Sequence, residues 1–203
     1  MARTSIYGVH PGITMIQNAI ASLPQKTGRS LDEWIALIRK HGPKDEAARR
    51  EWLKKEHGLG TNYAGWVAER AEGKGEDGDP DKYVEVAERY VDEMFAGGKA
   101  AMRPTYDALL KLGLSAGKDV KACPCKTIVP IYRRHVIAQI KPATRTRIDF
   151  GLALGATKTP KRLIDTGGLK KGDRITHRIE ISSPAEIDDE VKRWLKKAYE
   201  LDA

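Results

Sequence analysis

Apolar residues in the first third of the chain recur with the period of an α-helix. The clearest run is Leu31, Trp34, Ile35 and Ile38. Ser30 and Glu33 form a capping-box sequence before it, so a helix is predicted up to Lys40. A second helix is predicted over Asp45–His57, where the glycine that follows acts as a left-handed cap, and a third helix is predicted to begin near Thr61. These elements predict a small helical domain over residues 14–73.

A polar segment follows the helical domain. Residues 73–81, GKGEDGDPD, contain turn-forming and charged residues and no apolar residue, which is typical of a linker. After it, apolar side chains return at helical spacing in residues 83–95 and again in residues 102–112. A second domain is therefore predicted over residues 80–203, and it begins with two helices.

The apolar period then changes from 3.6 to 2. In residues 145–154, Ile148, Phe150, Leu152 and Leu154 alternate with polar or small residues, which predicts a strand with one buried face. Residues 174–181 repeat the alternation, and residues 128–132 and 136–140 predict two more strands. A closing helix is predicted to start at Ser183. The predicted fold class is α+β: the small helical domain plus a C-terminal antiparallel sheet of about four or five strands packed with helices.

Positive charge is concentrated in the predicted sheet. The chain has a formal net charge of +8, and residues 121–178 hold 14 Lys and Arg against 3 Asp. The rest of the chain is slightly acidic. A field concentrated in this way attracts anionic partners such as nucleic acid or phosphorylated metabolites, although a solvated basic surface without a ligand has the same composition.

The arginines of the sheet are the main candidate site. Four of them are predicted to project from one face by their period of 2, and two lie in a turn: Arg145, Arg147, Arg174, Arg178, Arg133 and Arg134. Guanidinium groups on a flat sheet grip phosphates. The favoured function is a non-enzymatic module that binds nucleic acid or another polyanion through this basic face. The sequence does not distinguish DNA from RNA.

A second candidate anion site is GLGTNYA, residues 58–64. Gly58 and Gly60 lie between two predicted helices and resemble the hairpin of helix-hairpin-helix DNA-binding modules. Glycines there let backbone N–H groups approach a phosphate. Simple capping of the preceding helix by Gly58 explains the same residues.

Two alternative functions remain open. A small anionic ligand, or the substrate of an enzyme, would bind in a cleft near His177, with Tyr132 and Arg178 beside it; no catalytic residue is assigned. His177 alternates with isoleucines and is expected to be partly buried. A protein-interaction role would use apolar surface left on the tryptophan-rich first domain.

The two cysteines are expected to be thiols. Cys123 and Cys125 are separated by one proline, a spacing that fits neither a structural zinc site nor a disulfide. No metal or cofactor is expected. The chain has no apolar run of membrane-spanning length and no signal-peptide pattern, so a cytoplasmic protein without a membrane partner is expected. The oligomeric state is not indicated.

Several stretches resemble a pairing of two bacterial domains of unknown function. The first, a short helical domain, is similar in QKTGRSLDEWIALIRK (residues 25–40) and REWLKKEHGLGTNYA (residues 50–64). The second resembles an α+β domain also found attached to predicted transport or restriction-related proteins. It is similar in KTIVPIYRRHVIAQIKP, RIDFGLAL, THRIEI and WLKKAYE. The two resemblances cover about residues 14–201 and imply no catalytic residues.

Overall fold

The chain forms two compact units in a computed structural model that describes residues 5–75, 78–160 and 162–203. The helical unit is Val9–Tyr83, and the sheet unit combines Val84–Ala203 with the short segment 5–8. That segment joins the sheet unit through a parallel bridge between Tyr7 and Ala122. Residues 76 and 77 of the predicted linker lie outside the described residues.

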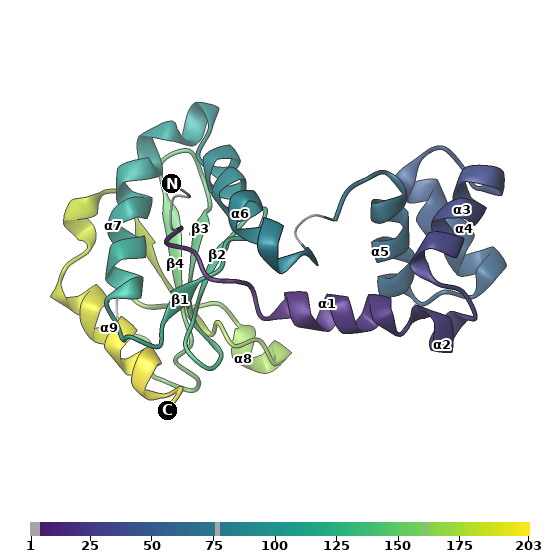
Figure 1. Ribbon diagram of the computed structural model, residues 1–203. Helices are drawn as coiled ribbons and strands as arrows, with labels where there is room; N and C mark the ends of the chain where they lie inside the picture. The colour runs from purple at the N-terminus through teal and green to yellow at the C-terminus, as the bar shows by residue number, and fades with distance from the viewer. Residues whose placement is uncertain (1–4, 76–77, 161) are drawn as a thin grey trace. The chain divides into compact units, whose positions relative to one another are not determined.

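The helical unit is built around a buried tryptophan. Its helices are α1 (Gly12–Ala21), α2 (Leu23–Thr27), α3 (Leu31–His41), α4 (Glu46–His57) and α5 (Thr61–Ala71) (Figure 1). The predicted capping box is confirmed, because the Glu33 N–H donates to Ser30 Oγ and the Ser30 N–H donates to the Glu33 carboxylate. Trp34 is 2% exposed, and its Nε1–H donates to Thr27 Oγ1 at 2.9 Å. The other buried core residues are Leu23, Ile38, Leu53, Leu59, Ala64, Val67 and Ala68.

The sheet unit contains one antiparallel sheet and the helices that pack on it. The chain passes through α6 (Pro80–Met94), the 3-10 helix η2 (Gly97–Met102) and α7 (Arg103–Leu114) before it enters the sheet. The strands are β1 (Lys121–Ala122), β2 (Val129–Tyr132), β3 (Val136–Pro142), β4 (Ile148–Leu152), β5 (Ile164–Asp165) and β6 (His177–Ile181). Their order is β1-β2-β3-β4-β6-β5. The predicted α+β class is confirmed. The described residues form six strands rather than four or five, because β1 and β5 are two-residue edge strands that show no alternation.

One face of the sheet is covered by helices. Both α7 and α9 (Asp189–Glu200) contact β3 and β4. Pairing places Phe150 opposite Ile179 and Leu152 opposite His177, so these buried side chains all face the helices. The alternate residues of the same strands, which include Asp149 and Arg178, point to the opposite side of the sheet. This side is here called the open face. The predicted alternation of β4 is therefore present.

Two predicted boundaries are wrong. The strand expected over residues 174–181 begins at His177. The side chain of Ile175 lies close to Gly151, because a Cβ added to this glycine would be 2.7 Å from Ile175 Cγ2. Ile175 thus covers the open face at Gly151 instead of lying beside His177. The closing helix begins at Asp189 rather than Ser183, because Asp188 is its N-cap and accepts the N–H of Val191. Residues 184–186 form only a 3-10 turn, η3.

None of the helices in the described parts of the chain is both long and apolar enough to span a membrane.

Candidate anion-binding site

Two of the predicted arginines share the open face, and both are paired with carboxylates. Arg178 Nη1 lies 2.7 Å from Asp149 Oδ2 and 3.1 Å from Glu180 Oε1. Arg147 Nη1 lies 3.1 Å from Glu180 Oε1, and its Nε lies 3.1 Å from Asp149 Oδ1 without forming a hydrogen bond. This cluster holds two positive and two negative charges. Its net charge is zero, which weakens attraction to an anion.

The other four arginines lie at the two ends of β3. Arg145 is exposed in the β3–β4 turn, where its side chain passes Gly98. Arg133 and Arg134 lie in the β2–β3 turn, and Arg174 donates to Val136 at the same end. Arg133 pairs with Asp119 at 2.8 Å and lies 4.1 Å from the centre of the Tyr199 ring. The single cationic face expected from the alternation is thus divided among three places.

Asp202 organises the sheet end at the β2–β3 turn. Its carboxylate is buried and accepts the backbone N–H groups of Arg134 and His135 at 3.0 and 2.9 Å. It also contacts His135 Nδ1 at 2.9 Å and Arg174 Nη2 at 2.6 Å. Burial alone would raise the pKa of Asp202, but the hydrogen bonds from His135 and the charge of Arg174 outweigh burial and lower this pKa below its ordinary value. Sequence reasoning missed Asp202, because no local pattern marks it.

Arg174 also lines an open pocket of about 600 Å³, here called the C-terminal pocket. Its lining residues are Ala153, Leu154, Gly155, Ala156, Thr157, Leu169, Asp173, Arg174, Thr176, Lys197 and Leu201. Two cations, Arg174 and Lys197, face one carboxylate, Asp173. Leu169 and Leu201 are more than half exposed, an unusual state for large apolar side chains that lie together at a pocket. With Asp202, the partner of Arg174, the two cations are offset by two carboxylates, so the pocket combines cationic donors with apolar side chains but has no net positive charge.

Lys197 and Arg174 keep donors for a ligand. Among the described residues, Lys197 has no carboxylate partner, and its Nζ lies 5.5 Å from the centre of the Trp194 ring. Arg174 uses Nη2 for Asp202 and Nε for the carbonyl of Val136, so Nη1 has no partner in the part of the chain that the structure describes. Both cations therefore have donors available at the pocket lining.

Tyr132, His177 and Arg178, named together for the predicted cleft near His177, do not lie around one cleft in the structure. His177 and Arg178 point to opposite faces of β6, because they are neighbours in a strand. Tyr132 on β2 is three strand spacings from β6, roughly 14 Å. Its pKa is raised by burial. His177 is nevertheless linked to the C-terminal pocket, because its Nδ1 lies 2.9 Å from Oγ1 of Thr176, a pocket residue.

The Gly58 hairpin caps one helix and begins the next. Gly58 has a φ of 68°, and its N–H donates to Lys54 O, so it ends α4 in the left-handed conformation that favours glycine. Gly60 is the N-cap of α5 and has no side-chain cap bond to offer. The predicted capping is confirmed. Phosphate binding at this hairpin stays a prediction.

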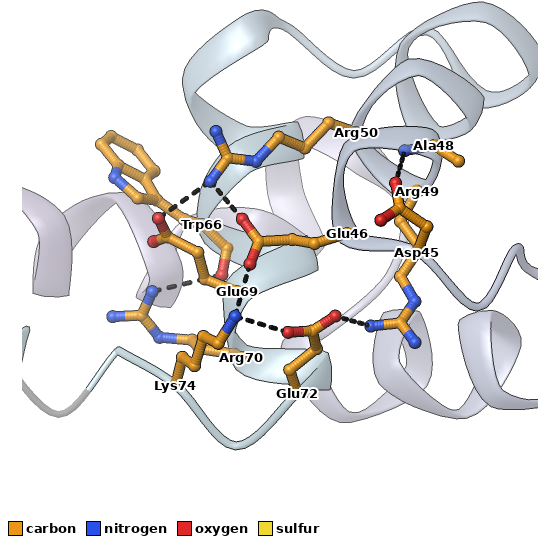
Figure 2. Close-up of polar contacts among 10 residues, drawn as sticks. All are labelled: Asp45, Glu46, Ala48, Arg49, Arg50, Trp66, Glu69, Arg70, Glu72 and Lys74. Carbon is orange, nitrogen blue, oxygen red and sulfur yellow. Dashed lines mark hydrogen bonds and ion pairs between the residues drawn. The ribbon is translucent and has the colours of Figure 1, made fainter.

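The charged side chains between α4 and α5 form a closed network. Figure 2 shows Arg50 between Glu46 and Glu69, and Lys74 between Glu46 and Glu72. Hydrogen bonding to Lys74 lowers the pKa of Glu46, and hydrogen bonding, first to Glu72, raises the pKa of Lys74. Arg49 completes the network by pairing with Glu72. These charges stabilise one another and join the two helices, so they present no net field to a ligand.

The cysteines lie at the start of the sheet as thiols, without a disulfide between them. Cys123 is buried, and burial raises the pKa of its thiol to about 12. A thiol with such a pKa is almost entirely protonated at neutral pH and is a poor nucleophile and metal ligand. Within the described residues, no group of three His, Cys, Asp or Glu side chains has the placement to hold a metal ion.

Comparison with known families identifies both parts of the chain. Residues 15–73 match a domain of unknown function, DUF4287, and residues 91–202 match a second one, DUF5655. The predicted pairing of two such domains is confirmed. No curated protein and no solved structure matches the chain. The second match covers more than half of the residues of the chain. The chain therefore belongs to the DUF5655 family, with a DUF4287 segment before that domain.

Proposed function

We propose that the sheet unit binds a small anionic ligand with an apolar body in the C-terminal pocket. The observation that carries the proposal is the meeting of Arg174 and Lys197 with the exposed Leu169 and Leu201 around one cavity of about 600 Å³. A cavity of this size is typical of small-molecule sites, which combine an apolar lining with a few polar groups that fix orientation. The ligand's anion would lie between the cations, and its body against the leucines.

Octanoate is a suitable probe, because it joins a carboxylate to a short apolar chain. Titration followed by amide chemical shifts is expected to move signals of residues 153–157 and 169–176. Lys197→Met is expected to weaken binding about fivefold, the value of one partly exposed ion pair. Lys196→Met is the matched control, since this neighbouring lysine is exposed on α9 and does not line the pocket. Equal weakening by both variants, or shifts confined to other regions, would refute the site.

A second candidate function is binding of nucleic acid through phosphate contacts. Several exposed cations of the sheet unit have no carboxylate within ion-pair distance among the described residues: Lys126, Arg134, Lys141, Arg145, Lys158, Lys170 and Lys171. They support a weak interaction without base specificity. The resemblance to domains attached to restriction-related proteins is in keeping with this candidate. The paired arginines of the open face would contribute little to it.

Mobility shifts with DNA and RNA across a salt series test this candidate through two matched variants. Arg145→Ala removes an unpaired cation and is expected to reduce the slope of log affinity against log salt by about one. Arg147→Ala removes an arginine whose charge Asp149 and Glu180 already offset, so the slope is expected to stay nearly unchanged. An affinity independent of salt in the unaltered protein would discard nucleic-acid binding.

A further inference from the structure

The helical unit contains a second pocket, of about 570 Å³, which is separate from the C-terminal pocket. Three segments of the unit line it: α1 with the turn after it, α2, and the start of α5. The lining residues are Met15, Asn18, Ala19, Ser22, Lys26, Gly60, Thr61, Asn62, Tyr63 and Trp66. This cavity is here called the α5 pocket.

One side of the α5 pocket is aromatic and held in place. Tyr63 and Trp66 meet edge to face, with ring centres 5.6 Å apart. The hydroxyl of Tyr63 lies 3.1 Å from Ser22 Oγ, a hydrogen bond that fixes the Tyr63 ring relative to the end of α1. Met15, 60% exposed, adds a polarisable thioether. Aromatic rings and a thioether together provide a surface on which a flat ring stacks.

Most of the other side chains of the pocket are polar, and the single charged one is a cation. Lys26 is exposed, and its Nζ lies 5.7 Å from the centre of the Tyr63 ring. No acidic residue lines the pocket. The amides of Asn18 and Asn62 and the hydroxyl of Thr61 offer hydrogen bonds at the same opening. An anionic group beside Lys26 would therefore meet a positive charge without an opposing carboxylate in the lining.

From this lining we propose that the α5 pocket binds a flat heteroaromatic ring that carries a phosphate, the chemistry of a nucleoside monophosphate. The ring lies against Tyr63 and Trp66, and the phosphate lies at Lys26. Both halves of the ligand are needed, because each half alone uses only part of the lining. The proposal is independent of the ligand of the C-terminal pocket, since all the lining residues belong to the helical unit.

The test is a titration of the whole ¹⁵N-labelled chain with AMP, adenosine and inorganic phosphate. AMP is expected to shift the indole N–H signal of Trp66 to saturation, whereas the indole of Trp194, in the sheet unit, stays in place. Adenosine and phosphate are each expected to bind at least tenfold more weakly than AMP. Lys26→Met is expected to lower the affinity for AMP about tenfold and to leave the affinity for adenosine unchanged.

Lys40→Met is the matched control, because Lys40 is an exposed lysine of α3 and lies outside the α5 pocket. Its affinity for AMP is expected to equal that of the unaltered chain. The proposal is overturned if AMP at a concentration on the order of 10 mM, which would saturate a site with a dissociation constant of about 1 mM or below, leaves the Trp66 indole signal unmoved. It is overturned equally if adenosine binds as tightly as AMP or if both lysine variants behave alike.

Discussion

Replacing Asp202 by alanine is expected to lower the free energy of unfolding of the sheet unit by about 3 kcal/mol. The substitution leaves the N–H groups of Arg134 and His135 without their acceptor and removes the partner of Arg174. The figure is at the low end for a broken buried ion pair, because the Arg174 side chain is 47% exposed and water solvates it in the variant. Urea unfolding at neutral pH measures the change.

Asp119→Ala provides the matched control for Asp202→Ala. Asp119 pairs with Arg133 at the same end of the sheet, but its side chain is 52% exposed. Its removal is expected to cost less than about 1 kcal/mol, as for other surface ion pairs. Equal losses in the two variants would show that burial of Asp202 does not distinguish it from a surface carboxylate.

The contribution of Asp202 is also expected to depend on pH. Its folded pKa is lowered, so the unfolded chain takes up the proton first as the pH falls. The stabilisation is therefore complete above the unfolded pKa of about 3.9 and is lost as the pH falls through the lower folded value. The difference in stability between the unaltered protein and Asp202→Ala should shrink when urea unfolding is repeated near the acid limit.

Trp34→Ala is expected to destabilise the helical unit strongly while the stability of the sheet unit stays unchanged. Truncation of a buried tryptophan costs about 3–5 kcal/mol, and the hydrogen bond to Thr27 is lost with it. A domain of this size has a total stability of roughly 4–11 kcal/mol, so the substitution removes a large part of it. Each unit has its own core, so the effect should stay local.

Amide hydrogen exchange, resolved by peptide, measures this effect separately in the two units. In Trp34→Ala, peptides from α3, α4 and α5 should lose protection, whereas peptides from β3 and β4 should keep it. Trp34→Phe is the control, because it retains most of the ring volume and loses mainly the hydrogen bond to Thr27, so it should cost about 1 kcal/mol. Loss of protection in both units would mean that they unfold as one.

Local patterns were sufficient to predict most of the long elements. The capping box at Ser30 and the left-handed Gly58 depend on a few neighbouring residues, and both appear where the sequence predicted them. The alternation in β4 likewise predicted which side chains lie under the helices. The pairing of two domains of unknown function was also visible in the sequence. The two-residue strands β1 and β5 were missed, because no periodicity exists over two residues.

The alternation showed which strand residues share a face, but it did not show which charged side chains would form ion pairs with one another. Arg147 and Arg178 lie on one face as alternation requires, yet Asp149 and Glu180 lie there too, because paired strands bring residues of both signs together. The two pockets are also products of tertiary structure. Lys197 and Arg174 line one pocket although 23 positions separate them in the chain, and Lys26 lies 5.7 Å from the Tyr63 ring centre across 37 positions.

The amino-acid sequence by itself predicted most of the longer helices, the main strands, the buried face of β4 and the division into two kinds of domain, because these follow from hydrogen bonds and apolar periods within short segments; the helices α1 and α2 were not predicted. Which cations are neutralised, which remain available to a ligand, and how Asp202 comes to hold the β2–β3 turn were decided by the tertiary structure. The physical reason is that electrostatic energy depends on distances in space, and packing sets these distances between residues that the sequence keeps far apart.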